Sequence, residues 1–145
     1  MQVKLYFVQD NYRFIWHYVS MDTQRLSYLL FVEDEPQFKY LIQRYADRSG
    51  FELLTTLKDG EILTLAMQWQ PKAVILDIDK PELDIAKVLG ELRSDVKARH
   101  IPIVVCSSSE AVLHKWGLEV DGSWLKPVLY DDFENTLAAI GIYTT

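Results

Sequence analysis

The sequence predicts an α/β fold in which a parallel sheet carries helices on both faces. From about residue 28 onward, short apolar runs alternate with segments of helical spacing, and five such strand–helix units follow one another. The runs 28–32 and 73–76 are apolar throughout, as expected of strands that are buried on both faces. The 145 residues, of which 49% are hydrophobic, are enough to build the core of one domain.

Charge and composition argue against several classes of protein. With 15 basic and 21 acidic residues, the net charge of −6 argues against direct nucleic-acid binding as the main activity. The single cysteine, Cys106, excludes an internal disulfide and fits a reducing cytoplasm. The three histidines are scattered, so no zinc site is expected. The sequence shows neither a membrane span nor a credible signal peptide, so we expect no membrane contact.

The pattern of residues 1–27 predicts an N-terminal extension that folds as a β-hairpin. Strands are expected over 5–8 and 13–19, with Gln9-Asp10-Asn11 as the turn. A strand would place four alternating aromatic side chains on one face: Tyr12, Phe14, Trp16 and Tyr18. A lone hairpin is only marginally stable in water, so this face should cover its own domain, a second copy of the chain or a partner. We expect a homodimer; the alternatives are a disordered tail and translation that begins at Met21.

The first two strand–helix units occupy residues 28–70. After the run 28–32, Pro36 suits the first turn of a helix that ends at Gly50. Phe51–Thr56 is the next strand, and Asp59-Gly60 is expected to form a turn before the second helix. Apolar residues at helical spacing define these two helices: Phe38, Leu41, Ile42 and Tyr45, then Ile62, Leu65, Ala66 and Trp69.

The remaining units follow Pro71. The apolar run 73–76 leads into Asp77, and Pro81 then forces a turn. The other expected elements are strands over 101–106 and 123–125 and a short helix, Glu110–Trp116, closed by Gly117. Two further helices are marked by apolar residues at helical spacing: Ile85, Leu89, Leu92 and Val96, then Phe133, Leu137 and Ile140.

The predicted strands end in side chains that can act on phosphate. Glu33-Asp34, Asp77 and Ser107 stand at three strand ends, and Lys126 follows the last strand. Right-handed crossovers place these ends on one edge of the sheet. Close carboxylates repel one another unless a cation joins them, and oxygen ligands favour Mg²⁺. A lysine and a hydroxyl can neutralise phosphoryl oxygens, which leaves Asp77 as the nucleophile. The alternative is that Asp77 only caps the following turn.

Together these motifs resemble the receiver domain of bacterial two-component response regulators. The resemblance covers roughly residues 28–141. It rests on four motifs in order: the run 32–36, Leu76-Asp77 with Pro81 four residues later, the run 102–107, and Lys126-Pro127. The spacing also fits, since Ser107 lies 107 − 77 = 30 residues after Asp77. Each motif alone is weakly specific, whereas four of them in the right order are strongly specific.

The resemblance implies a doubly wound, five-stranded, flavodoxin-like fold over residues 28–145, after the extension of residues 1–27. It implies a stand-alone cytoplasmic regulator that accepts a phosphoryl group on Asp77 from a histidine kinase or a phosphotransfer protein. Such a regulator signals by phosphorylation-dependent binding to a downstream protein, which the sequence does not name. It contacts no nucleic acid or membrane and catalyses only its own phosphorylation and dephosphorylation.

The resemblance also implies the role of each residue at the site. Mg²⁺ would be held by Asp34, by the phosphoacceptor and by the backbone carbonyl of Asp79, with Glu33 acting mainly through a bound water. Ser107 would supply the phosphate-sensing hydroxyl, and Lys126 the ammonium that contacts the phosphoryl group.

The chain departs from the family's usual pattern at several positions. Ile85 stands where a glycine is usual, and Ser123 stands where an aromatic switch residue is usual. Trp124 would point to the opposite face of its strand, so we expect a signal to pass through the loops at the site or through Trp124 rather than by the usual aromatic exchange. Asp79 adds a fourth acid, which we interpret as a solvated loop residue. The stretch before Lys126 is short, which predicts a clipped fourth helix.

Two other functions stay open on the sequence alone. Asp77-Ile78-Asp79 also fits the two-aspartate motif of haloacid-dehalogenase-like phosphatases, in which the first aspartate is the nucleophile and the second a general acid/base. That family needs a longer chain and carries this motif on the strand nearest its N-terminus. The other alternative is a pseudo-receiver, which keeps the fold but is not phosphorylated. Ser123 favours it, whereas the intact acids, hydroxyl and lysine argue against it.

Overall fold

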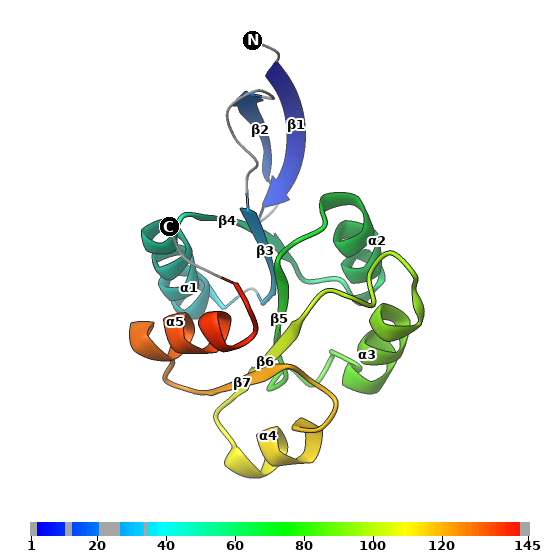
Figure 1. The fold of residues 1–145 in the computed structure, drawn as a ribbon, viewed down its shortest axis with the longest axis vertical. Helices are drawn as coiled ribbons and strands as arrows, with labels where there is room; N and C mark the ends of the chain where they lie inside the picture. Colours follow the sequence, from blue (N-terminus) through cyan, green and yellow to red (C-terminus); the bar gives the residue numbers. More distant parts are fainter. Residues whose placement is uncertain (1–2, 11–12, 21–26, 34, 143–145) are drawn as a thin grey trace.

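The computed structural model describes residues 3–10, 13–20, 27–33 and 35–142. Its main sheet has five parallel strands, as predicted (Figure 1). In spatial order they are β4 (Phe51–Thr56), β3 (Ser27–Val32), β5 (Ala73–Asp77), β6 (Ile103–Ser107) and β7 (Gly122–Leu125). This order is the doubly wound, flavodoxin-like arrangement, in which the chain runs outward in both directions from a central pair of strands.

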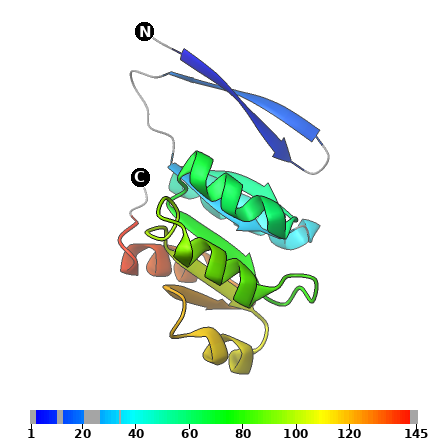
Figure 2. The same ribbon diagram turned by 90° about the vertical axis from the view of Figure 1, so that its right-hand side faces the viewer.

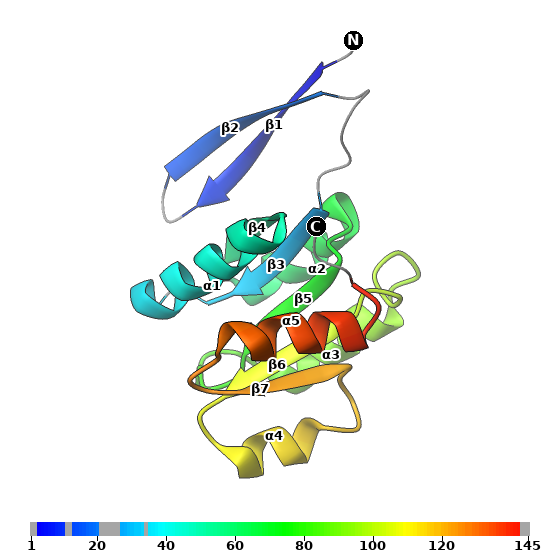
Figure 3. The same ribbon diagram turned by 60° about the vertical axis from the view of Figure 1, so that its left-hand side comes forward.

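Helices cover both faces of this sheet (Figures 1 and 3). α1 (Pro36–Ser49) and α5 (Tyr130–Ala139) lie on one face, and α2 (Asp59–Trp69), α3 (Ile85–Ser94) and α4 (Glu110–Trp116) lie on the other. The longest of them, α1, has 14 residues. Among the described residues, no helix is both long and apolar enough to cross a lipid bilayer.

Each face of the main sheet has its own apolar core, because alternate residues of a strand point to opposite faces. Along β3, Leu30 and Val32 pack with α2 and α3, whereas Leu29 and Phe31 pack with α1 and α5. All four of these side chains are at most 4% exposed. Every residue of β5 and β6 is also buried. The apolar runs in the sequence therefore mark strands that are covered on both faces.

The ends of α1 follow from its sequence. The Glu35 carboxylate caps the helix by accepting hydrogen bonds from the backbone N–H groups of Gln37 at 3.1 Å and Phe38 at 2.7 Å. At the other end, Gly50 adopts a φ of 82° and donates its N–H to carbonyls of the last turn. Glycine adopts this left-handed conformation without a steric cost, so the predicted end of the helix at Gly50 is confirmed.

Three predicted element boundaries are wrong. Asp59 and Gly60 do not form a turn; they are the first two residues of α2, where an acid suits the positive end of the helix dipole. Val96 lies beyond the end of α3 and is 69% exposed, so it does not continue the apolar face of that helix. β6 begins at Ile103 rather than at residue 101 and includes Ser107 as its last residue.

The N-terminal segment forms the predicted hairpin as a separate antiparallel sheet of β1 (Val3–Asp10) and β2 (Arg13–Ser20) (Figure 2). Its strands are longer than predicted, because Gln9 and Asp10 pair with β2 and do not belong to the turn. Asn11 lies outside the described residues, as do the side chains of the predicted aromatic face. Cα atoms of β1 approach those of β4 within 8 Å, so the hairpin lies beside β4, an outer strand of the main sheet.

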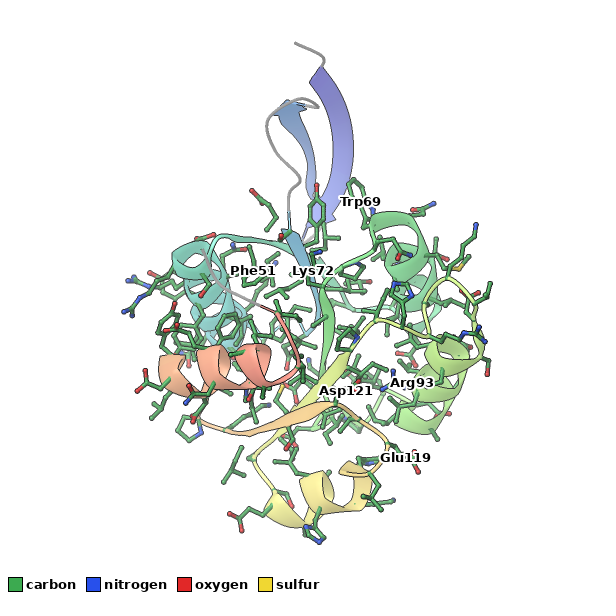
Figure 4. All side chains as sticks on the ribbon, viewed as in Figure 1. Phe51, Trp69, Lys72, Arg93, Glu119 and Asp121 are labelled. Atoms are coloured by element: carbon green, nitrogen blue, oxygen red, sulfur yellow. The ribbon has the colours of Figure 1, made fainter. Side chains whose placement is uncertain are left out.

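Polar contacts connect α3 to the edge of the sheet at which β6 and β7 begin (Figure 4). Arg93 of α3 and Asp121, which precedes β7, form an ion pair with 2.7 Å between Nη2 and Oδ2. The same Asp121 oxygen accepts the backbone N–H of Ile103 at 2.8 Å. These contacts tie α3 to the starts of two strands, and the polar residues of the candidate site lie at the opposite edge.

Candidate functional site

The carboxyl ends of β3, β5, β6 and β7 meet at one edge of the sheet. The chain leaves β3 and β5 in opposite directions across the sheet, and this switch point is where doubly wound folds bind ligands. Glu33 follows β3, Asp77 ends β5, Ser107 ends β6 and Lys126 follows β7. The structure therefore brings together four of the predicted site residues. A fifth, Asp79, follows Asp77 by two residues and also lies at the site, and a sixth, Asp34, lies outside the described residues.

Asp77 stands at the centre of the site and is only 1% exposed. Its Oδ2 accepts a hydrogen bond from Lys126 Nζ at 2.6 Å, and its Oδ1 accepts the backbone N–H of Asp79 at 3.0 Å. Burial, followed by a hydrogen bond with Glu33, raises the pKa of Asp77 from 3.8 to about 6, against the lowering effect of Lys126. A buried carboxyl with a perturbed pKa and a specific charge partner is typical of a functional site.

Glu33 is the second buried acid of the site and is 3% exposed. The ammonium of Lys80 lies 2.7 Å from its Oε1, and the same oxygen accepts the backbone N–H of Glu35 at 2.9 Å. Lys80 belongs to the loop between β5 and α3. The role of Lys80 does not follow from the sequence, because periodicity does not indicate where a loop side chain points.

Asp79 lies in the turn after β5 and is exposed, as expected of a loop residue, but its carboxylate also accepts several hydrogen bonds from the site. Its Oδ1 accepts the Ser107 hydroxyl at 2.5 Å, and its Oδ2 accepts the Ser108 N–H and hydroxyl at 2.9 and 2.8 Å and Lys126 Nζ at 3.1 Å. Burial favours the neutral acid, but these hydrogen bonds hold the pKa of Asp79 well below its usual range. The sequence did not indicate these hydrogen bonds, because the partners come from the ends of other strands.

Ser107 and Lys126 complete the site from the last two strands. The Ser107 side chain is fully buried, and its oxygen also accepts the backbone N–H of Ser109 at 3.0 Å. Burial alone would lower the pKa of Lys126, but its contacts with Asp77 and Asp79 outweigh that effect and raise it. Lys126 thus remains charged between two carboxylates, an arrangement suited to neutralising an incoming anion.

Comparisons with known proteins place this arrangement among signalling proteins. No protein-family profile matches the chain. Among solved structures, the receiver domain of the sensor histidine kinase PA1611 from Pseudomonas aeruginosa superimposes with a TM-score of 0.70 at 19% identity, covering 81% of this chain and 99% of that domain. That structure has a magnesium ion coordinated in its active-site cleft. At this identity, the match establishes the fold.

Two relatives extend the match to the sequence. The probable methanogenesis regulatory protein FilR2 of Methanothrix harundinacea is 27% identical, over 79% of this chain and 81% of FilR2. The polar-differentiation response regulator DivK of Brucella ovis is 30% identical over 80 residues, which span 55% of this chain and 65% of DivK. The chain carries a response regulator receiver domain.

The acids of this receiver domain fit a hard divalent cation. Glu33 and Asp77 offer only oxygen atoms, are both buried, and lie close enough to share a hydrogen bond. Lys80 already brings positive charge to this pair, and a cavity of about 100 Å³ adjoins Glu33 and Lys80. Within the part of the chain that the structure describes, no three His, Cys, Asp or Glu side chains form a complete metal cluster. The predicted ligand Asp34 stands outside that part.

Two departures of the receiver domain from the usual pattern are visible in β7 and α4. Ser123 is exposed, whereas Trp124 is 2% exposed, stacks on Phe133 at 5.5 Å between ring centroids and donates its Nε1–H to the Asp132 carbonyl. Trp124 therefore points to the face opposite Ser123, as predicted. α4 has only seven residues, which agrees with the predicted clipped helix.

Proposed function

We propose that this receiver domain accepts a phosphoryl group on Asp77 from a histidine kinase or a phosphotransfer protein in the cytoplasm. Its phosphorylation state would then control its binding to a downstream protein. The observation that carries this proposal is the 2.6 Å contact between Lys126 Nζ and the buried carboxylate of Asp77. It supports the proposal because a cation beside this carboxylate, at the edge of the sheet where such folds bind ligands, would neutralise an incoming phosphoryl group.

The proposed transfer is a substitution at phosphorus. A carboxylate oxygen of Asp77 attacks the phosphorus of a phosphohistidine, so a P–O bond forms and the P–N bond breaks. The electron pair of the broken bond leaves with the imidazole, which takes a proton from solvent. Lys126 and the Ser107 hydroxyl then donate hydrogen bonds to phosphoryl oxygens of the aspartyl phosphate.

Mg²⁺ is part of this proposal. The residues that would hold it are Glu33 (through a water), Asp34, Asp77 and the backbone carbonyl of Asp79. When bound, Mg²⁺ neutralises charge on the phosphoryl oxygens during transfer. The proximity of Glu33 and Asp77 supports this assignment, because a cation relieves the repulsion between their two charges.

Incubation with acetyl phosphate and Mg²⁺ is expected to add the mass of one phosphoryl group to the intact protein. Acetyl phosphate supplies an activated phosphoryl group without a kinase, and the carboxylate of Asp77 replaces its acetate. Peptide mapping should place the added mass on the peptide that contains Asp77, and EDTA should prevent the reaction. An unchanged intact mass at every Mg²⁺ concentration would reject phosphorylation and favour the pseudo-receiver alternative.

The phosphatase alternative requires Asp79 to act as a general acid, which must hold a proton before it donates one. The hydrogen bonds from Ser107, Ser108 and Lys126 keep this carboxyl ionised instead. The contacts therefore favour a receiver that reacts only on itself. Repeated turnover of a phosphoester such as p-nitrophenyl phosphate would reverse this conclusion.

The N-terminal hairpin is proposed as a contact surface between two copies of the chain. β1 and β2 form a sheet of their own, and among the side chains that the structure describes, both cores of the main sheet consist of buried residues from 29 onward. Deletion of residues 1–21 is therefore expected to leave a folded receiver domain while turning a dimer into a monomer. Sedimentation velocity on both chains measures this change, and circular dichroism checks the fold. Full-length and truncated chains that are both monomers would contradict the proposed surface.

A further inference from the structure

The Asp79 carboxylate accepts hydrogen bonds from the groups at the ends of β6 and β7 that would bind phosphoryl oxygens in the proposed site. These donors are the Ser107 hydroxyl at 2.5 Å, the Ser108 N–H at 2.9 Å, the Ser108 hydroxyl at 2.8 Å and Lys126 Nζ at 3.1 Å. Hydroxyl, backbone N–H and ammonium groups are the usual donors to phosphate as well as to carboxylate. The Asp79 carboxylate therefore occupies the position that the anionic phosphoryl group would take.

A phosphoryl group on Asp77 would need the same donors. Lys126 Nζ lies 2.6 Å from Asp77 Oδ2 and 3.1 Å from Asp79 Oδ2, so one ammonium already spans both carboxylates. The Ser107 hydroxyl can donate only one hydrogen bond, and it donates that bond to Asp79. A phosphoryl group carries a charge of about −1.5 to −2, so it would also be repelled by a carboxylate at this position. The Ser107 proton can serve only one of the two anions, and the repulsion between them opposes their sharing the other donors.

We propose that the Asp79 side chain is an internal competitor of the phosphoryl group. In the unphosphorylated chain it occupies the phosphoryl-binding donors, and it must leave them before they can hold a phosphoryl group on Asp77. The inference rests on the proposed function. Asp79 lies in the turn after β5 and its side chain is 30% exposed, so rotation into solvent leaves both apolar cores intact. Ser107 and Ser108 are consequently drawn toward the site before phosphorylation.

Replacing Asp79 is expected to strengthen the binding of beryllofluoride, a non-covalent analogue of the phosphoryl group. If only a fraction of molecules has the donors free, the apparent affinity is reduced by that fraction. One charge-assisted hydrogen bond of ordinary strength leaves about a tenth of the molecules free. At saturating Mg²⁺, Asp79→Ala should therefore lower the beryllofluoride concentration for half-saturation about tenfold. Asp79→Asn, which keeps the shape but not the charge, should give a smaller decrease.

Glu82→Gln is the matched control, because it removes one negative charge from the same loop. Glu82 lines the cavity beside Glu33 and Lys80, and Ser107 does not line that cavity. A general effect of charge would appear in both variants, whereas displacement of a competitor appears only at Asp79. NMR titration of the full chain follows the amide signals of Ser107 and Ser108. Before any ligand is added, the Ser108 amide signal should already shift in Asp79→Ala, since its acceptor is gone.

The outcomes separate this inference from the proposed function. Tighter binding in Asp79→Ala with an unchanged Glu82→Gln supports the competitor. Equal or weaker binding in Asp79→Ala, with wild type still binding beryllofluoride, overturns the competitor and leaves the phosphoacceptor function intact. Wild type and all variants that fail to bind beryllofluoride and gain no phosphoryl mass overturn both.

Discussion

The Asp77→Asn variant is expected to gain no phosphoryl group from acetyl phosphate under conditions that phosphorylate the wild type. The substitution removes the carboxylate that we propose as the nucleophile, one oxygen of which lies 2.6 Å from Lys126 Nζ, and leaves a side chain of nearly the same size. Because the side chain is only 1% exposed, an isosteric change is the one least disturbing to the fold. Intact-mass analysis measures the effect, with Asp131→Asn, on the exposed start of α5, as a control that should react like wild type.

The same variant is expected to be more stable than wild type at neutral pH when the metal is chelated. The pKa of Asp77 rises from 3.8 in the unfolded chain to about 6 in the folded chain. Between these values the folded state binds more protons, so wild-type stability falls as pH rises from about 4 to about 6. Asparagine does not ionise and escapes this loss.

A shift of this size corresponds to roughly 3 kcal/mol as an upper limit, and the lost attraction to Lys126 reduces it. We expect Asp77→Asn to gain about 1–3 kcal/mol in the free energy of unfolding at pH 7.5 and little below pH 4. Urea titrations in EDTA at both pH values measure the difference. A gain that is independent of pH would show that packing rather than ionisation causes it.

Phosphorylation of the Asn variant to the wild-type level would mean that another side chain is the acceptor.

Phe133→Ala is expected to lower the free energy of unfolding by about 3–5 kcal/mol, the usual cost of removing a buried phenyl ring. Phe133 is fully buried in the core between the sheet and the α1–α5 layer. Its ring lies 5.5 Å from that of Trp124 and 5.6 Å from that of Tyr45, so it joins β7, α1 and α5. The loss would remove a large part of the stability of a domain of this size.

Phe133→Leu is the matched control, since it keeps an apolar side chain and most of the volume. Its expected cost is about 1–1.5 kcal/mol. Urea unfolding at constant slope measures both variants, and a lower midpoint reports the lost stability. A cost below about 1 kcal/mol for Phe133→Ala would show that the surrounding side chains collapse into the space.

The main sheet and four of its site residues could be predicted because both depend on local pattern and simple topology. Strands covered on two faces are written as apolar runs, and right-handed connections place their ends at one edge. Glu33, Asp77, Ser107 and Lys126 follow from that rule alone. The hairpin strands also follow from local pattern. The predicted turn comes too early, because Gln9 and Asp10 are polar residues that nevertheless pair with β2.

The roles of Asp79 and Lys80 could not be predicted. Both lie in a loop, where no periodicity states which way a side chain points. Asp79 finds its partners 28 and 47 residues away, in Ser107 and Lys126. Lys80 pairs across the edge with Glu33. Their effect depends on the distance between strands that only folding brings together.

The sequence by itself determined the succession of strands and helices along the chain, the placement of helices on both faces of the sheet, and the chemical groups available at the edge of the sheet. These properties depend on residue type and spacing, which the chain carries before it folds. The tertiary structure alone decided how those groups share protons and charge. Burial raises the pKa of Asp77, and hydrogen bonds from Ser107, Ser108 and Lys126 hold the carboxylate of Asp79 at the site. Electrostatic and hydrogen-bond energies change steeply over a few ångströms, a scale that sequence spacing does not specify.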